Sequence, residues 1–341
     1  LGNTFATLNG LGDPNGSSAT GWFRYAATNP GTCSDSFGSR APTTGGSSLG
    51  SGTSNQGFSQ SITGLTSGVT YYFCAIVQSA EGTSFGAVLS FTTTGAPIAT
   101  TVAASAITTT TATLNGQVNP NGSEAYGYFR YANADPGACN DSFGTRVPYY
   151  SSSDTYAGTG TSPVTFNQPL TGLLPGRTYW FCAIGRNGYG TSFGEVLSFT
   201  TQAAAPTVTT SAASDLTGDG AMLNGSVNPG GAATTAWFRY STTSPGTCND
   251  TFGTRAPATG GTSLSAGNNN VTVGQAVTGL TPGTTYYFCA LAQNSVGLTV
   301  ATNVRTFTTP TPPVAVTVAA SNVYDTSGYA SGVAVSGNYA Y

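Results

Sequence analysis

The fold of this chain is decided by the run Thr70-Tyr71-Tyr72-Phe73-Cys74-Ala75-Ile76. Nearly the same run returns around Cys182 and again around Cys289, at intervals of 108 and 107 residues. Aromatic and β-branched residues in such a run predict a strand. A period of this length is too long for one unit of a solenoid and matches a whole domain. The chain is therefore a string of three similar modules.

A second cysteine recurs upstream of each run. It lies in Pro-Gly-Thr-Cys33-Ser-Asp35-Ser-Phe37-Gly-Ser-Arg40-Ala-Pro42, and this segment returns around Cys139 and Cys248. Two cysteines per module predict one intramolecular disulfide each, and with it an extracellular or cell-surface location. One cysteine pair without histidine does not complete a tetrahedral zinc site. The predicted pairs are Cys33–Cys74, Cys139–Cys182 and Cys248–Cys289.

Each module reads as short β-patterned runs separated by turn residues, and stretches with a helical period are absent. About seven strands in a hundred residues are typical of an antiparallel β-sandwich. We therefore predict an all-β protein, a tandem array of three sandwiches with a strand-rich extension. The predicted boundaries are 1–94 for module 1, 95–203 for module 2, 204–310 for module 3 and 311–341 for the extension.

The turn before each cysteine run carries a resemblance to a known family. Leu280-Thr-Pro282-Gly283-Thr-Thr-Tyr286 has the spacing of the tyrosine corner of fibronectin type III domains. The spacing repeats up to Tyr179, and up to Tyr71 with Ser67 in place of proline. The run from Leu114 to Gly122 also resembles the fibronectin-like modules of large bacterial secreted proteins. This resemblance covers residues 1 to about 310 and implies a fold but not a function.

Strand alternation predicts a covered outer face in each module. If Tyr71 points into the core, Cys74 points outward. Trp22 and Arg24 on the preceding strand then face outward too, which leaves much apolar surface exposed. Cys33 lies in a long Gly/Ser-rich segment that follows the Trp22 strand, and a disulfide to the outward Cys74 would draw this segment across the face. We call this predicted cover the lid.

Polar residues repeat on the strand and in the lid. We expect an Asp–Arg pair that holds the lid, with the strand arginine stacked on the neighbouring aromatic ring. The alternative is a replicated ligand or Ca²⁺ site, but Ca²⁺ takes six to eight oxygens and each lid offers one carboxylate. The strand residues are Trp22 and Arg24, Tyr128 and Arg130, and Trp237 and Arg239; the lid residues are Asp35 and Arg40, Asp141 and Arg146, and Asp250 and Arg255.

Composition argues against several classes of function. Charged residues make up 6% of the chain, the net charge is −3, and there is no histidine and no lysine. Without a basic stripe, nucleic acid is not an expected partner. Without histidine or lysine there is no base to activate a serine or threonine, so we expect neither an enzyme nor a cofactor. No apolar run is long enough to cross a bilayer.

The two ends of the chain are complementary. Thr309–Pro313 reads as a stiff linker, and Val314–Ser321 resembles the first strand of modules 2 and 3. Module 1 has no such strand before Ala6-Thr-Leu-Asn-Gly10. Residues 322–341 resemble the opening of an LVIVD repeat, a strand-rich unit of surface proteins. One partial repeat cannot bury its own apolar face.

We therefore predict that the extension packs as β-strands against another chain or a continuation of its own. Donation to module 1 of the next chain would polymerise the protein. The first interpretation is a non-catalytic extracellular stalk or fibre subunit whose partners are copies of itself or other surface proteins. The alternative is an adhesin-like or carbohydrate-binding array with glycans as ligands. The predicted assembly residues are Val314, Val316, Val318, Val323, Val333 and Val335.

Overall fold

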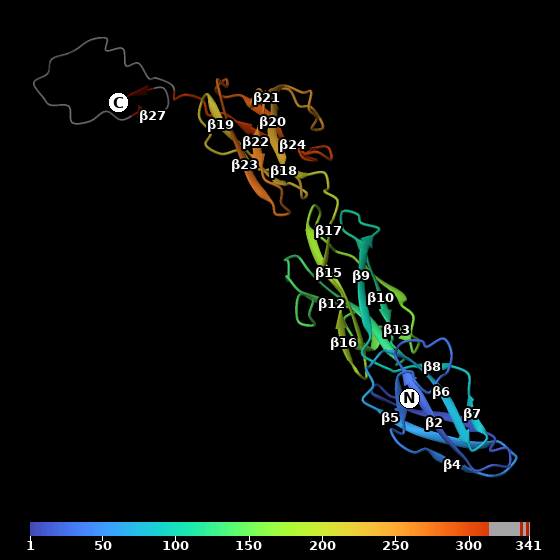
Figure 1. Cartoon of the computed structure of the whole chain (residues 1–341). Helices are drawn as coiled ribbons and strands as arrows, with labels where there is room; N and C mark the ends of the chain where they lie inside the picture. Colours follow the sequence, from blue (N-terminus) through green and yellow to red (C-terminus); the bar gives the residue numbers. More distant parts are fainter. Residues whose placement is uncertain (314–334, 337–338, 341) are drawn as a thin grey trace, which may run out of the picture. The chain divides into compact units, whose positions relative to one another are not determined.

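The computed structural model describes residues 1–313, 335–336 and 339–340. In this part of the chain the regular structure is β, apart from one 3-10 turn at Ser151–Ser153. Contacts between Cα atoms divide the chain into two compact units, Leu1–Gln202 and Ala203–Tyr341. The first unit holds modules 1 and 2, and the second holds module 3 (Figure 1).

Each module contains eight or nine strands. Module 1 has β1 (Phe5–Gly12), β2 (Ala19–Ala26), β3 (Ser39–Ala41), β4 (Ser47–Gly50), β5 (Gln56–Thr63), β6 (Thr70–Ser79), β7 (Gly82–Phe85) and β8 (Leu89–Thr92). Module 2 has β9 (Ile98–Ser105), β10 (Ala112–Asn119), β11 (Ala125–Ala132), β12 (Thr145–Val147), β13 (Thr155–Gly158), β14 (Val164–Leu170), β15 (Thr178–Asn187), β16 (Gly190–Phe193) and β17 (Leu197–Thr200). Module 3 has β18 (Thr207–Thr210), β19 (Gly220–Asn228), β20 (Thr234–Ser241), β21 (Thr254–Ala256), β22 (Thr262–Leu264), β23 (Val271–Thr278), β24 (Thr285–Gln293), β25 (Leu298–Val300) and β26 (Arg305–Thr308).

Modules 2 and 3 share one topology. In module 2 a three-stranded sheet, β14-β10-β9, faces a second sheet in which β11 and β15 are central and β12, β13, β16 and β17 flank them. Module 3 repeats this arrangement with β23-β19-β18 facing the sheet built on β20 and β24. All pairings are antiparallel. The predicted all-β sandwich class is confirmed (Figure 1).

A tyrosine corner is present in every module. The hydroxyl oxygens of Tyr71, Tyr179 and Tyr286 each accept a hydrogen bond from the backbone N–H five residues upstream, at 2.9, 2.9 and 3.0 Å. This contact fixes the turn before the second central strand of sandwiches of the immunoglobulin and fibronectin type. Together with the strand order, it makes the three modules fibronectin type III-like.

The core of each module is built from the inner faces of the two sheets. In module 2 the ring of Phe129 lies 4.5 Å from that of Phe166 and 6.4 Å from that of Phe181, centre to centre. All three rings are buried. The buried residues come from alternate positions along each strand, as a two-layer sandwich requires.

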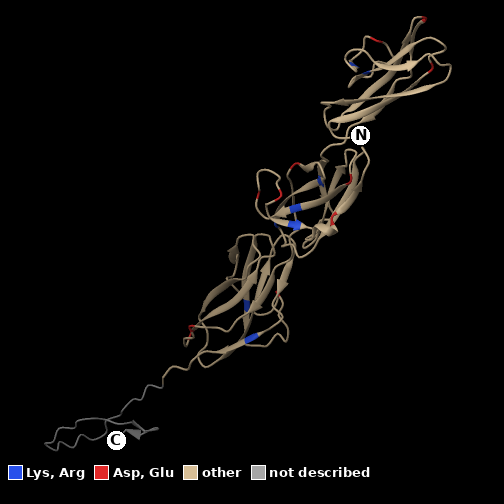
Figure 2. Cartoon of the chain, turned by 90° about the horizontal axis from the view of Figure 1, so that it is seen from below, with Lys and Arg blue, Asp and Glu red and all other residues tan. Residues whose placement is uncertain are grey.

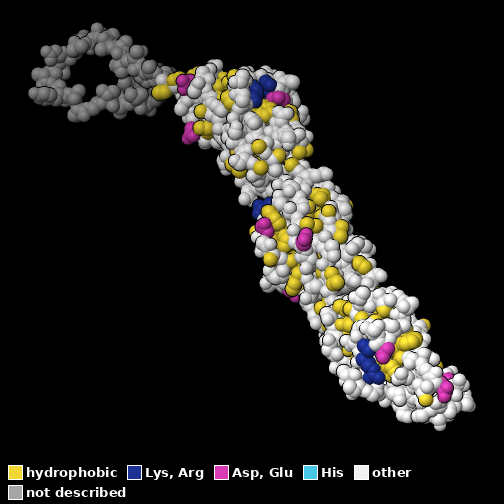
Figure 3. All heavy atoms as spheres, in the orientation of Figure 1, with side chains coloured by type: hydrophobic (Ala, Val, Ile, Leu, Met, Phe, Trp, Pro, Cys, Tyr) yellow, Lys and Arg dark blue, Asp and Glu magenta, His cyan; other side chains and the backbone are white. Residues whose placement is uncertain are grey.

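Charged side chains are sparse in every module (Figure 2), and uncharged groups dominate the face seen in Figure 3. In the part of the chain that the structure describes, no helix is long and apolar enough to span a membrane.

Candidate functional site

A lid covers the outer face of each module. Its disulfides join Cys33 to Cys74, Cys139 to Cys182 and Cys248 to Cys289, which are the pairs that the repeat predicts. In module 1 the disulfide, Trp22 and Ile76 form a small second core against Phe37 and Val88. Trp22, Tyr128 and Trp237 are 4%, 2% and 4% exposed. These repeated aromatics are therefore packing residues and offer no platform for a ligand.

One carboxylate ties each lid to its sheet. Asp35 Oδ1 accepts hydrogen bonds from Trp22 Nε1 at 2.8 Å and from Arg24 Nε at 2.9 Å. Module 3 repeats both contacts, with Asp250 as the acceptor, at 2.9 and 3.0 Å. Charge-assisted hydrogen bonds of this kind orient two side chains at once. They hold the lid beside its disulfide, since Arg24 lies directly opposite Cys74 in the pairing of β2 with β6.

The prediction that the strand arginine stacks on the aromatic ring was wrong. The guanidinium over the ring of Trp22 belongs to Arg40 of the lid strand, at 4.5 Å from the ring centre. Arg40 lies directly opposite Arg24 in the pairing of β2 with β3. Because the two arginines are neighbours, the strand arginine, Arg24, donates to the carboxylate and Arg40 stacks on the ring. The same exchange places Arg146 over Tyr128 at 3.9 Å and Arg255 over Trp237 at 4.6 Å.

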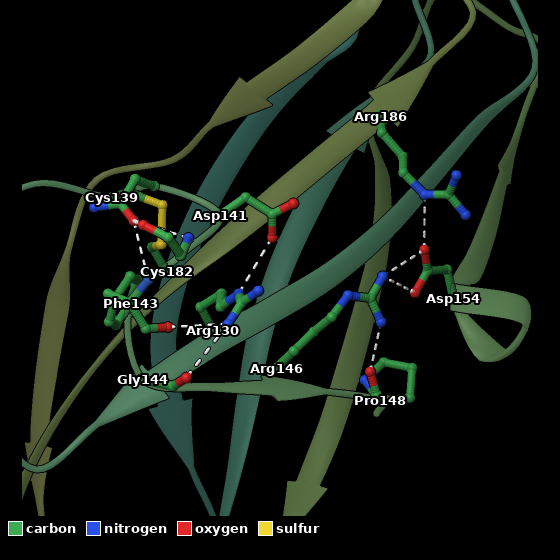
Figure 4. Close-up of polar contacts among 12 residues, drawn as sticks. Arg130, Cys139, Asp141, Phe143, Gly144, Arg146, Pro148, Asp154, Cys182 and Arg186 are labelled. Atoms are coloured by element: carbon green, nitrogen blue, oxygen red, sulfur yellow. Dashed lines mark hydrogen bonds and ion pairs between the residues drawn. A yellow bond between two sulfur atoms is a disulfide. The ribbon is translucent and has the colours of Figure 1, made fainter. Parts of the chain in front are cut away.

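Module 2 adds an ion-pair cluster that the repeat did not reveal (Figure 4). The carboxylate of Asp154 is fully buried and accepts hydrogen bonds from Arg146, at 2.6 and 2.8 Å, and from Arg186, at 2.8 Å. In modules 1 and 3 the arginine equivalent to Arg146 donates to the backbone carbonyl of a glycine instead. Sequence reasoning missed this cluster because Asp154 and Arg186 occur in one module only. Both arginines also contact aromatic rings, so the cluster has a packing role.

Asp35 and Tyr128, which both lie under or in a lid, have shifted pKa values. Burial acts to raise the pKa of Asp35, but hydrogen bonds from Trp22 and Arg24 outweigh it, and the pKa is lowered from its ordinary value of 3.8. Burial, followed by a hydrogen bond with Asp141, raises the pKa of the Tyr128 hydroxyl. Tyr128 is therefore neutral and Asp35 charged at neutral pH.

We expect the contact of Asp35 with Trp22 to fail only in acid. A lowered folded-state pKa means that the stabilisation is present above the ordinary pKa and is lost as pH falls through the lower folded value. The Trp22 indole N–H resonance should therefore stay constant at neutral pH and move below about pH 4. An NMR titration checks this. The Asp35→Asn variant should lack the acid-induced shift, and an unchanged shift in that variant would assign it to another group.

The structure shows an open cavity on module 1. It has a volume of about 700 Å³ and is lined by residues of β1, β5, β6 and β8 and of the β7–β8 turn. Phe73 and Ala75 line it and are half-buried. Their counterparts are fully buried: Phe181 and Ala183 in module 2, and Phe288 and Ala290 in module 3. Within residues 1–313 the core of module 1 is therefore open at this place.

The missing cover is a strand. In module 2, β9 pairs with β10 and contacts β15, β16 and β17. In module 3, β18 pairs with β19 and contacts β24 and β25. Among the residues that the structure describes in module 1, β1 pairs with β5 alone and its other edge has no strand partner. The cavity occupies the place where β9 and β18 lie in the complete modules.

Within the described residues, the backbone N–H of Ala75 in module 1 has no counterpart of the threonine acceptor found in modules 2 and 3. The Ala183 N–H donates to Thr101 Oγ1 at 3.0 Å, and the Ala290 N–H donates to Thr210 Oγ1 at 3.1 Å. The corresponding Ala75 lines the cavity, and no described residue takes the place of the threonine. A strand that fills the cavity must therefore cover its apolar wall and also supply a hydrogen-bond acceptor for the Ala75 N–H.

A side-chain amide shows the same deficit. Asn115 Nδ2 donates to Ala103 O at 2.8 Å and to Ser105 Oγ at 3.0 Å, both on β9. Asn224 does the same in module 3. For Asn9 of module 1 the structure records one acceptor within the described residues, Thr7 O at 3.5 Å. The amide of Asn9 is exposed at this sheet edge and is therefore available to an added strand.

Most of the predicted assembly residues, Val314, Val316, Val318, Val323 and Val333, lie outside the described residues, as does most of the segment that resembles an LVIVD repeat. Of the extension, Val335–Ser336 (β27) pairs with Tyr339–Ala340 (β28). Within the described residues no group of histidine, cysteine, aspartate and glutamate side chains is arranged to hold a metal ion.

Comparisons with known proteins leave the function open. No protein-family model matches the chain, and no curated protein matches it. The FN1–FN3 domains of chicken CNTN1 are similar over 91% of this chain and 95% of theirs, at 14% identity and a TM-score of 0.30. The sensor domain of the anti-sigma factor RsgI4 of Pseudobacteroides cellulosolvens is similar over 35% of this chain and 99% of its own, at 18% identity and a TM-score of 0.23. Because both TM-scores are low, the fold assignment rests on the strand topology and the tyrosine corners.

Proposed function

We propose that this protein is a non-catalytic, extracellular structural subunit of a fibre or stalk, and that the cavity of module 1 is its assembly site. A disulfide in each module suits an oxidising compartment. The lids bury the repeated aromatic residues, which removes the main surface that an array of ligand-binding modules would present. The proposal rests on one observation, the open strand position of module 1.

A vacant strand position is an assembly device because it exposes a sheet edge and a core at once. An unpaired edge is a template for another strand. A strand added from a second molecule contributes backbone hydrogen bonds, and its side chains fill the cavity. Since donor and acceptor lie on different parts of the chain, the contact is heterologous and propagates into an open fibre.

A steric block of the cavity tests this proposal. In module 2 a Cβ atom on Gly194 would lie 2.5 Å from Thr101 Oγ1 of the covering strand. The module 1 counterpart is Gly86, where the three atoms nearest to a Cβ atom all belong to Ala75, the nearest at 3.2 Å. Gly86→Val should therefore leave module 1 folded and abolish assembly, as seen by negative-stain electron microscopy and light scattering of the full chain.

The matched control is Gly52→Val, because a Cβ atom at Gly52 meets no atom within 4 Å. This variant should assemble like the parent chain. Fibres of normal abundance from the Gly86→Val chain, or a parent chain that stays monomeric at high concentration, would contradict the proposed function.

A further inference from the structure

We infer that the strand that fills the cavity is Val314–Ser321 of a second copy of this chain, held in one register with Thr317 opposite Gly10. This inference rests on the proposed function and adds the identity, register and specificity of the donated strand. Its basis is the chemistry of the two module strands that already occupy the equivalent position.

The three segments share the residues that make the contacts. Ile98-Ala-Thr-Thr101-Val-Ala-Ala-Ser105 forms β9, and Thr207-Val-Thr-Thr210-Ser-Ala-Ala-Ser214 begins with β18. The extension reads Val314-Ala-Val-Thr317-Val-Ala-Ala-Ser321. The fourth residue is threonine in all three, and all three end in Ala-Ala-Ser.

The shared positions match the two groups of module 1 that lack these partners within the described residues. Thr317 corresponds to the threonines whose hydroxyl oxygens accept the N–H of Ala183 and Ala290. It would accept the N–H of Ala75 in the same way. Ser321 corresponds to Ser105 and Ser214, which accept from an asparagine amide. It would accept from Asn9 and complete the contacts that module 1 lacks.

The register follows from the paired modules. Thr101 lies opposite Gly116, and Thr210 lies opposite Gly225. Gly10 holds the same place on β1 as these glycines, since each follows Leu-Asn in its strand. Thr317 is therefore placed opposite Gly10, and Val316 is placed opposite Leu11.

One cross-strand pair distinguishes this docking from the pairings within modules. The residues opposite each other at that position are Gln117 and Thr100 in module 2, and Ser226 and Thr209 in module 3. Both pairs are polar. In module 1 the position is Leu11, which is 70% exposed, and in the extension it is Val316. An apolar pair stabilises neighbouring strands, so the pair of Leu11 with Val316 favours the extension over β9-like or β18-like strands.

The tether favours a second copy over the same chain. Thr309–Pro313 separates β26 from Val314, and five extended residues reach roughly 18 Å at most. An eight-residue strand such as β2 alone extends about 26 Å. To reach the cavity of its own chain, this tether would require the end of β26 to lie within roughly 18 Å of that cavity. A neighbouring molecule meets no such restriction.

Cysteine cross-linking in the full chain tests the register. Directly opposite residues on paired strands are close enough for a disulfide. Leu11→Cys with Val316→Cys should give a ladder of covalent multimers on non-reducing gels. Leu11→Cys with Ala315→Cys is the control, because a slip of one residue turns the second side chain to the other face. It should give little or no ladder.

The hydroxyl is tested by Thr317→Val, which keeps the side-chain shape and removes the acceptor. Loss of one hydrogen bond that leaves a buried N–H unpaired should raise the critical concentration for assembly about tenfold or more. Thr317→Ser keeps the hydroxyl, so its critical concentration should be close to that of the parent chain. Because these variants retain an intact cavity, their failure can be separated from failure of the proposed function.

Three results would overturn the inference. The first is assembly with equal ladders from both cysteine pairs. The second is assembly that is indifferent to Thr317→Val. The third is cross-linking that yields monomers only, which would place the strand in its own chain. If the parent chain does not assemble at all, the proposed function falls and this inference with it.

Discussion

Replacing Cys248 and Cys289 together by alanine should lower the free energy of unfolding of module 3 by about 4 kcal/mol, because the disulfide closes a 41-residue loop and so restricts the unfolded chain. For a domain of this size the unfolding temperature should fall by on the order of 15 °C. The lid should also loosen, since the disulfide belongs to the small core around Trp237. Calorimetry of the full chain and tryptophan fluorescence measure the two effects.

The Thr247→Ala variant is the control, because it alters an exposed residue of the same lid and leaves the disulfide in place. It should unfold like the parent chain. Modules 1 and 2 of the double variant should keep their own transitions, because their disulfides are unchanged. An unshifted transition of module 3 with unchanged fluorescence would mean that the contacts of Asp250 and Arg255 hold the lid without the disulfide.

The features that could be predicted from the sequence are those that repeat. Three copies of the same alternation around Cys74, Cys182 and Cys289 determine which side chains face the core, and the tyrosine spacing locates the turn before each of these strands. From those two facts the sandwich class, the outward cysteines and the covered outer face follow. The open strand position could also be predicted, because module 1 has no leading strand before Ala6 whereas Val314–Ser321 resembles an additional one.

The features that could not be predicted depend on single contacts. Two arginines share each outer face, and the sequence does not say which takes the carboxylate, since both have the reach and the charge to do so. Asp154 and Arg186 belong to module 2 alone, so no repeat draws attention to them. The short lid strands β3 and β4 have three and four residues, too few for a periodic pattern. The role of Thr101 depends on its hydroxyl lying beside the N–H of Ala183, on a strand that is distant in sequence, so no local pattern reveals it.

A chain that carries its own covering strand should no longer assemble. We consider a variant in which a second copy of Val314–Ser321 and one glycine precede Leu1. The glycine and Leu1–Phe5 then reproduce the six-residue connection, residues 106–111, between β9 and β10. The first residue of that connection, Ala106, has a φ of 49°, and its module 3 counterpart, Asp215, also has a φ of 49°. Glycine adopts this conformation without steric cost.

In this variant the cavity is filled from within, at an effective concentration far above that of any free extension. The protein should be monomeric by light scattering at concentrations where the parent chain forms fibres. The unfolding temperature of module 1 should rise, because Phe73 and Ala75 become buried like their counterparts. Hydrogen exchange at the Ala75 amide should slow, since it gains an acceptor. A variant with the same eight residues in scrambled order should behave like the parent. Fibres from the self-complemented chain, with no change in exchange at Ala75, would show that the cavity of module 1 is not where these molecules join.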